Sequence, residues 1–211
     1  LMATGASDLL ANTGGVEITL GKEMIRTPVD DAIGYIKKTV IGDVMNIKKV
    51  RVDKEGTGMG WGAVYAQYLE SMDQIGEQGN GLSVSRQLYK GDEALNESAP
   101  LKVGDKITVR LTVKADRDMD FVQIKDDRAA CMEPLQAVSG FRWSNGLGYY
   151  QATKDASTQF FIDQMRKGTY VIEYQVYVNR TGEYQTGIAT VQSAYAPEFG
   201  GHTGGYRVMV E

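Results

Sequence analysis

The sequence contains few of the residues that most often build reactive sites. Among its 211 residues it has one cysteine, one histidine and 4 prolines. A single cysteine cannot form an internal disulfide, and with one histidine it cannot complete a structural zinc site of the Cys/His kind. Any catalytic mechanism that needs an imidazole would have to use His202, which stands among glycines in residues 200–205. We interpret His202 as a residue of a flexible loop and predict no catalytic residue.

The sequence also lacks a long apolar run and an excess of basic charge. No stretch of about 18 apolar residues is present, so no transmembrane helix is predicted. The 23 Lys and Arg residues are outnumbered by 27 Asp and Glu residues, which gives a formal net charge of −4. Because nucleic acid binding needs a basic surface, nucleic acid is not an expected partner. The N-terminus has neither the charge pattern of a signal peptide nor a native start, so we expect a fragment of a longer protein.

The residues that are present predict a folded, all-β chain. Hydrophobic residues at 42% and charged residues at 24% are close to the globular average. Apolar and polar residues alternate at 16–20, 107–113 and 170–178, as half-buried strands require. Further strands are predicted at 121–126, 184–195 and 206–210. Short strands that are separated by turns, with no helices between them, predict antiparallel β-sandwich domains.

Four other segments have a less regular pattern. Residues 1–12 have apolar side chains without strand alternation and are interpreted as the end of a helix. Residues 61–68 have the composition of a strand, although their spacing also fits a helix. The polar, glycine-bearing residues 77–81 are predicted to be a linker. Residues 179–183 are predicted to join two strands as a hairpin, with glycine where a positive φ is needed.

A glycine motif and two acidic pairs are the first candidates for chemistry. Residues 58–63 read Gly-Met-Gly-Trp-Gly-Ala, which fits a form of the dinucleotide fingerprint. That fingerprint needs a βαβ unit, and no such unit follows, so we interpret the segment as a glycine-rich hairpin. Asp30 and Asp31, and likewise Asp126 and Asp127, are adjacent. Neighbouring residues of a strand point to opposite faces, so neither pair can flank one scissile bond, and no metal site is predicted.

The single cysteine is another candidate. A reactive internal thioester needs the arrangement Cys-x-Glu-Gln, in which the thiolate takes the acyl group of the glutamine. Here Cys131 is followed by Met132, Glu133 and Pro134, and proline has no acyl group to give. Gln136 lies two residues too far along the chain. We therefore interpret Cys131 as a small, buried, free thiol, and no cofactor is predicted.

A cluster of aromatic residues offers the strongest candidate site. Phe141, Trp143, Tyr149 and Tyr150 lie within ten residues of one another. Rings of this kind form platforms on which sugars stack, and they also anchor protein cores and interfaces. The alternatives therefore are a carbohydrate-binding surface and a packing or interaction surface.

Several motifs, taken in order, carry a resemblance to a known family. They include Gln-Leu-Tyr at 87–89, Leu-Lys-Val-Gly-Asp at 101–105, the run from Asp126 to Pro134, Thr-Gln-Phe-Phe at 158–161, Lys-Gly-Thr-Tyr at 167–170 and Tyr-Ala-Pro-Glu-Phe at 195–199. Residues 60–211 in this way resemble the C-terminal part of bacterial alpha-2-macroglobulin family proteins, especially those of the Bacteroidetes type. The resemblance implies that 81–211 is the terminal macroglobulin-like module. It implies that 13–78 is part of a CUB-like β domain and that 1–12 is a helical remnant of the thioester domain.

The resemblance also implies a function. Proteins of this family trap proteases: a bait region is cut and the molecule then rearranges around the attacking enzyme. The fragment itself would not be an enzyme, and its partners would be the upstream domains of its own polypeptide and, through the parent protein, attacking proteases. The implied location is the periplasm or cell envelope, with a membrane contacted only through an anchor of the parent. A carbohydrate-binding module of the envelope is the alternative.

Overall fold

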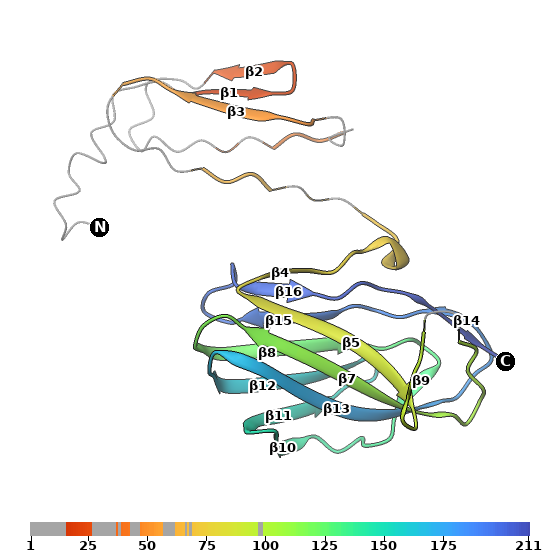
Figure 1. Ribbon diagram of the computed structural model, residues 1–211. Coiled ribbons are helices and arrows are strands. Elements are labelled where there is room, and N and C mark those ends of the chain that lie inside the picture. Colours follow the sequence, from red (N-terminus) through yellow and green to blue (C-terminus); the bar gives the residue numbers. More distant parts are fainter. Residues whose placement is uncertain are drawn as a thin grey trace. The chain divides into compact units, whose positions relative to one another are not determined.

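The computed structural model describes most of the chain in two separate units. The described residues are 16–26, 37, 39–42, 47–56, 62–65, 67, 69–96 and 99–211, with the backbone alone at 23, 25 and 26. The chain divides into the compact units Leu1–Gln67 and Tyr68–Glu211 (Figure 1). The predicted helix at 1–12, the acidic pair Asp30 and Asp31, and residues 58–61 of the glycine motif lie outside the described residues.

The first unit contains a three-stranded antiparallel sheet. Its strands are β1 (Val16–Leu20), β2 (Glu23–Arg26) and β3 (Val50–Lys54), in the order β2-β1-β3. The strand predicted at 16–20 is thus confirmed. It ends at a tight turn in which Gly21 has a φ of +59°, a conformation that glycine adopts without steric cost.

The second unit is a β-sandwich made from one long, folded sheet. Its strands are β4 (Gln78–Asn80), β5 (Leu82–Lys90), β6 (Glu93–Ala94), β7 (Lys106–Ala115), β8 (Met119–Asp127), β9 (Met132–Pro134), β10 (Gly140–Ser144), β11 (Leu147–Thr153), β12 (Ser157–Met165), β13 (Gly168–Val178), β15 (Ala189–Ser193) and β16 (Gly200–His202). Their order is β10-β11-β12-β8-β15-β16-β4-β5-β7-β13-β9, with β6 beside β5, and every pair is antiparallel. The sheet turns back on itself at β16 and β4, so β5, β7 and β13 cover β8, β12 and β11 (Figure 1). The strands β14 (Gly182–Gln185) and β17 (Arg207–Val210) pair separately.

The core lies between these two layers and follows from the alternation of the strands. In β7 every second side chain from Ile107 to Val113 is buried, and Ile124 and Phe160 are buried in the opposite layer. Burial of each such side chain stabilises the fold by about 1.5–3 kcal/mol. The all-β, antiparallel sandwich predicted from the sequence is confirmed, including the strands at 107–113, 121–126 and 170–178.

Helical structure in the described part of the chain is limited to one 3-10 turn, Met72–Gln74. No helix among the described residues is long and apolar enough to cross a membrane.

The strand predicted at 61–68 is wrong where the structure describes it. Residues 62–65 and 67 form no strand. Val64 and Tyr65 are exposed, as is Leu69 just beyond. A strand composition needs a neighbouring strand to pair with, and these described residues have none.

The linker predicted at 77–81 is also wrong, because β4 occupies Gln78–Asn80 and joins the two layers of the sandwich. Gly79 lies opposite Gly201 of β16, and a Cβ on Gly201 would come within 2.7 Å of the Gln78 and Leu82 carbonyl oxygens. The glycines therefore allow strands to approach closely, where the sequence had indicated a flexible connection.

The connection at 179–183 differs from the prediction in its partner. β13 and β14 do not pair with each other, since β14 pairs with β17. Gly182 does adopt a positive φ, of +134°, but in a chain segment that leaves the large sheet. Residues 184–195, predicted as one strand, are split between β14 and β15.

Candidate functional site

The hairpin of β10 and β11 separates the four aromatic residues of the predicted site. Phe141 lies opposite Tyr150, and their rings make an edge-to-face contact at 5.1 Å. Trp143 lies opposite Gly148, where a Cβ would be 2.8 Å from the indole ring, so the ring rests directly on the backbone of β11. Tyr149 is buried on the other face, at 5.6 Å from the ring of Phe160. Three of the four rings therefore share one face and the fourth belongs to the interior.

The exposed rings continue onto the next strand. Tyr150 lies opposite Phe161 of β12, which is 39% exposed, and Phe141 and Trp143 are 78% and 77% exposed. We refer to Phe141, Trp143, Tyr150 and Phe161 as the aromatic surface. Exposed aromatic rings gathered on one sheet face are typical of a binding surface, because each ring offers a large area at a low cost in side-chain entropy.

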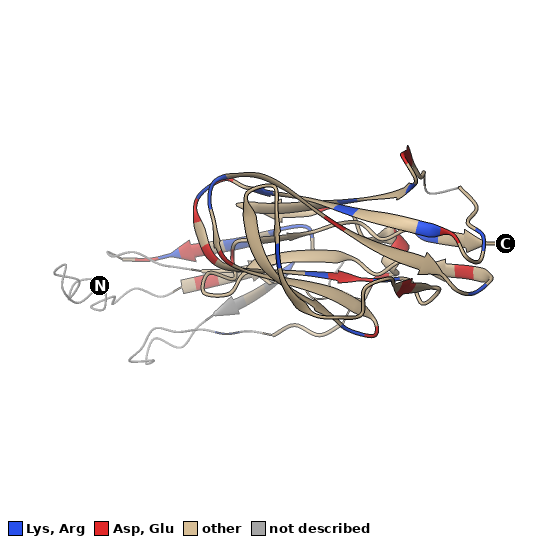
Figure 2. Cartoon of the chain, turned by 90° about the horizontal axis from the view of Figure 1, so that it is seen from below, with Lys and Arg blue, Asp and Glu red and all other residues tan. Residues whose placement is uncertain are grey.

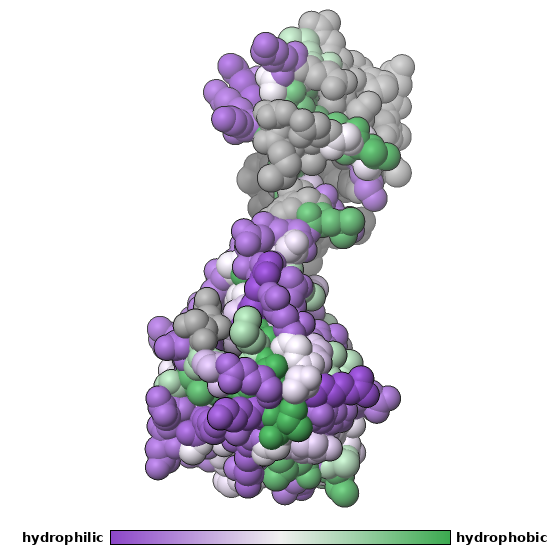
Figure 3. All heavy atoms as spheres, turned by 90° about the vertical axis from the view of Figure 1, so that its right-hand side faces the viewer, coloured by the Kyte–Doolittle hydropathy of each residue, from purple (hydrophilic) through white to green (hydrophobic). Residues whose placement is uncertain are grey.

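The rest of the surface has a mixed character. Lys and Arg lie among Asp and Glu along the strands, without a large area of one sign in the view of Figure 2. On the side shown in Figure 3, hydrophilic residues cover most of the second unit and apolar residues form small, separate groups.

A buried polar network links the two layers of the sandwich. Arg86 of β5 donates through Nη1 to Asp126 Oδ1 at 2.6 Å, and both side chains are almost fully buried. Arg86 also donates through Nη2 to Thr186 Oγ1 and to the Gly187 carbonyl oxygen. Tyr174 of β13 donates its hydroxyl hydrogen to Asp126 Oδ2 at 2.8 Å.

Burial sets the protonation behaviour of this network. Burial raises the pKa of the Asp126 carboxyl, while Arg86 and Tyr174 oppose that rise. Burial also raises the pKa of Tyr174 well above its ordinary value, and the Asp126 carboxylate acts in the same direction. Tyr174 therefore stays a hydrogen-bond donor at physiological pH, and the network is suited to holding the layers together.

Sequence reasoning missed Arg86, although a signal was present. In β5 the buried positions are Leu82, Val84 and Leu88, and Arg86 takes the remaining place in that period of two. Asp126 occupies the same kind of inward place in β8. Two opposite charges at inward positions of two strands indicate a buried ion pair.

The side chains of Asp126 and Asp127 point to opposite faces of their strand, as the sequence predicted. Asp126 is directed into the core, whereas the Asp127 carboxylate lies 3.0 Å from Lys125 Nζ at the partly exposed face. Cys131 is fully buried, as predicted, and burial raises the pKa of its thiol. No group of three His, Cys, Asp or Glu residues among the described residues is arranged to hold a metal ion.

His202 differs from the predicted loop residue. It ends strand β16, where it lies between Gln78 and Thr190 on the neighbouring strands. Its side chain is half-buried, and its Nδ1 lies 3.2 Å from the Thr203 carbonyl oxygen. Pairing with the two neighbouring strands holds the backbone at His202 in the sheet.

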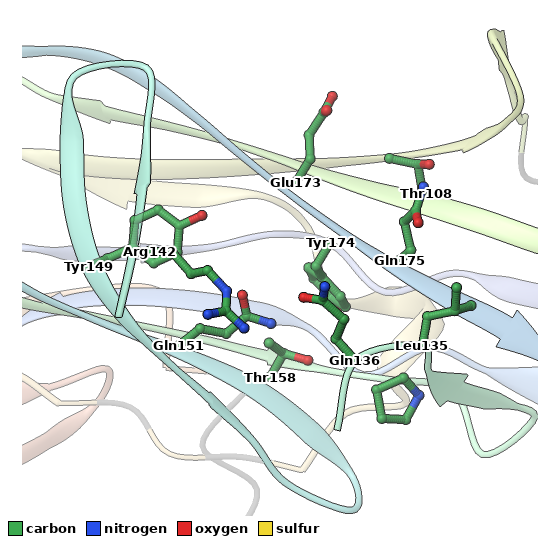
Figure 4. Close-up of a pocket in the computed structure, with 11 residues that line it drawn as sticks. Thr108, Leu135, Gln136, Arg142, Tyr149, Gln151, Thr158, Glu173, Tyr174 and Gln175 are labelled. Atoms are coloured by element: carbon green, nitrogen blue, oxygen red, sulfur yellow. The ribbon is translucent and has the colours of Figure 1, made fainter. Parts of the chain in front are cut away.

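A cavity of about 410 Å³ lies between the layers, on the side where the folded sheet has its two free ends (Figure 4). Its lining residues come from both layers and from the segment after β9: Thr108, Pro134, Leu135, Gln136, Arg142, Tyr149, Gln151, Thr158, Glu173, Tyr174 and Gln175. Most of them are polar, which is unusual for a space between two β layers. The cavity shares Tyr174 with the buried network.

Comparisons with known proteins agree with this fold. The family model described as "Bacterial Alpha-2-macroglobulin MG10 domain" matches residues 81–198. The native alpha-2-macroglobulin of Escherichia coli, solved from domain MG7 to the C-terminus, matches with a TM-score of 0.54 and 14% identity, over 96% of this chain and 34% of that chain. The Escherichia coli protein activated by porcine elastase matches with a TM-score of 0.56 and 14% identity, over 94% of this chain and 18% of that chain.

A similarity in sequence extends to one eukaryotic protein. The chain is 28% identical over 166 residues to "Circularly permutated Ras protein 2" of Dictyostelium discoideum, which covers 75% of this chain and 4% of that protein. The chain thus spans a small part of the length of each of these relatives. At these identities, the likeness to the solved structures shows the fold.

Proposed function

The chain belongs to the bacterial alpha-2-macroglobulin family, and from this premise we propose that it is a non-catalytic domain of a protease inhibitor. The observation that carries the proposal is the match of the MG10 domain model to residues 81–198, which includes most of the β-sandwich. A domain of this kind acts through the surfaces that it offers to its neighbours, and its strands supply a rigid support for them.

The aromatic surface is the part of the sandwich best suited to such a contact. Its rings are held in place, because Trp143 rests on Gly148 and Phe141 packs on Tyr150. Rigid aromatic anchors are enriched at the centres of protein interfaces. We assign the upstream thioester domain of the same polypeptide as the partner, with the contact holding that domain until a protease cuts the bait region.

The domain division and the location follow from the same proposal. Residues 81–211 would be the terminal macroglobulin-like module and 13–78 part of a CUB-like domain, with 1–12 a helical remnant of the thioester domain. The parent protein would act in the periplasm or cell envelope, where it meets attacking proteases.

The decisive experiment uses the full-length parent protein. Parent proteins with Phe141→Ala and Trp143→Ala combined, or with Val103→Ser as a control at another exposed apolar position, are mixed with trypsin, and the cleavage of a large protein substrate is measured. We expect the double variant to lose much of the protection of the substrate and the control to keep it. Equal protection by both variants would exclude the aromatic surface from the trapping rearrangement.

The exposed rings also support the alternative, a carbohydrate-binding module. A glycan array probed with the 211-residue chain tests it, because stacking on Trp143 would make binding depend on that ring. Binding that disappears in Trp143→Ala would favour the alternative, and an array without binding would remove it.

A further inference from the structure

The cavity between the layers is lined by two largely buried residues whose polar ends have no hydrogen-bond partner among the described residues. Tyr149 and Gln151 are 6% and 5% exposed. Both side chains line the cavity, and no residue in the described part of the chain forms a hydrogen bond with the Tyr149 hydroxyl or with the Gln151 amide. These polar ends face the space of the cavity, so they are free to bond to a molecule that enters it. We propose that this cavity is a binding site for a carboxylate group.

The positive charge that such a group needs is supplied by Arg142. Arg142 lies directly opposite Tyr149 in the β10–β11 hairpin, and Gly140 lies opposite Gln151. A Cβ on Gly140 would be 3.4 Å from Arg142 Nη1, so the absent side chain leaves room for the guanidinium to extend toward Gln151. Figure 4 shows the side chains of Tyr149, Arg142 and Gln151 together on one side of the cavity.

The charge of Arg142 is not neutralised by a protein carboxylate. Its Nη1 donates to the Phe141 carbonyl oxygen at 3.2 Å and its Nη2 to the Val138 carbonyl oxygen at 3.3 Å, and no ion pair with a described residue is formed. These two bonds hold the guanidinium in place. Three donors therefore line the same side of the cavity: the guanidinium, the Tyr149 hydroxyl and the Gln151 amide.

The opposite wall does not cancel this charge. Its one carboxylate belongs to Glu173, which is paired with Arg110 at 2.5 Å on the neighbouring strand. Gln136 adds a neutral polar group on this side of the cavity. The lining is thus positive on the Arg142 side and neutral elsewhere, which favours an anion with further polar groups beside its charge.

The size of the cavity limits the ligand to a small molecule or the end of a chain. A volume of about 410 Å³ lies within the range of ligand pockets, about 300–1,000 Å³. A carboxylate with neighbouring amide or hydroxyl groups occurs at the C-terminus of a peptide and in a sugar acid. Both sources present the same chemistry to Arg142, Tyr149 and Gln151.

Nuclear magnetic resonance titrations of the 211-residue chain test the site. The probes are N-acetylglycine for a peptide terminus and D-glucuronate for a sugar acid, with N-acetylglycinamide and D-glucose as uncharged counterparts. We expect at least one acid to shift the Gln151 side-chain amide signals, with an affinity in the low millimolar range because small ligands make few contacts. The acid that binds more tightly identifies the source of the carboxylate.

Three variants separate the site from nonspecific effects. Arg142→Met should weaken acid binding by about tenfold or more, and Tyr149→Phe by about two- to tenfold, because each removes one donor. Tyr195→Phe removes a hydroxyl from an exposed ring outside the cavity lining and should leave the affinity unchanged. The proposal is overturned if neither acid shifts the Gln151 signals, if the uncharged probes bind equally well, or if Arg142→Met binds the acids as tightly as the unsubstituted 211-residue chain does. This titration does not depend on protease trapping, so its outcome is separate from that of the proposed function.

Discussion

Replacement of Arg86 by methionine should destabilise the sandwich far more than the loss of a charge from an exposed ion pair of its strands. The change removes the guanidinium that bonds to Asp126 and to the acceptors at Thr186 and Gly187. Methionine keeps most of the volume of the arginine stem, so the effect comes mainly from the lost charge and hydrogen bonds.

The size of the loss follows from the burial of the pair. Asp126 is 1% exposed and would keep only the hydrogen bond from Tyr174. Leaving one partner of a buried ion pair without its counter-charge costs about 3–5 kcal/mol of the free energy of unfolding. For a chain of this length that corresponds to a fall in Tm of about 6–20 °C.

Urea unfolding of the 211-residue chain, followed by circular dichroism, measures this loss. The matched control is Arg110→Met, which breaks the Arg110–Glu173 ion pair on the neighbouring strand, where both partners are 42% exposed. We expect a far smaller loss for the control, because water already solvates both charges. Replacing all three members of the network, as Arg86→Met, Asp126→Leu and Tyr174→Phe, should recover much of the stability. The reasoning is refuted if Arg86→Met loses no more stability than Arg110→Met.

Three further predictions concern other contacts. The pKa of Tyr174 is raised in the folded state, so above about pH 10 the tyrosine is deprotonated in the unfolded chain but still protonated in the folded one, and stability falls as the pH rises. Thermal unfolding of Tyr174→Phe should therefore show a smaller fall in stability above about pH 10 than that of the unsubstituted chain. Partial burial would raise the pKa of Asp105, but the hydrogen bonds from the Lys90 ammonium and from the Lys102 backbone amide lower it below its ordinary value. Asp105→Asn should therefore reduce stability by about 1 kcal/mol at pH 7 and by progressively less below about pH 4. Gly201→Ala should lower Tm and speed amide exchange in β4 and β16, because its Cβ would meet two carbonyl oxygens at 2.7 Å.

Each of these has an outcome that contradicts it. If the stability of Tyr174→Phe falls with pH as steeply as that of the unsubstituted chain, the Tyr174 hydroxyl has the same pKa in the folded and unfolded states. An Asp105→Asn effect that is constant from pH 3 to pH 7 would exclude the ion pair as its cause. Gly76→Ala is the control for Gly201→Ala, since a Cβ on Gly76 would meet nothing within 4 Å, and equal effects of both would argue against the close approach at Gly201.

The regular strands could be predicted because their pattern is local. The alternation of apolar and polar residues in 107–113 and 170–178 predicts both that these residues form strands and which of their faces is buried. Strands β7 and β13 form there as expected. Strand pairing is not local. Residues 77–81 have the composition of a linker, and they form β4 because a strand more than 100 residues away, β16, lies beside them. The sequence of a segment does not contain its partner, so the linker and the hairpin at 179–183 were wrong.

The site residues were only partly predictable for the same reason. Period-two alternation places Phe141 and Trp143 on one face and Tyr149 on the other, although grouping by composition joined all of them. Gln151 and Arg142 could not be identified as site residues from the sequence, because the cavity that they line is formed only when the two layers pack together. The buried pair of Arg86 and Asp126 could have been predicted from the sequence, because each is a charged residue at a position where the alternation of its strand places a buried apolar residue.

The folded sheet makes the two sides of the sandwich mechanically unequal. At β16 and β4 the layers are joined by continuous backbone hydrogen bonds, whereas β10 and β9, the two ends of the sheet, are not bonded to each other. A small rotation of one layer about the joined side would act like a lever, and the largest displacement would occur at the open side. The cavity lies at that open side, so a molecule bound between Arg142 on one layer and Tyr174 on the other would oppose this rotation where the displacement is largest.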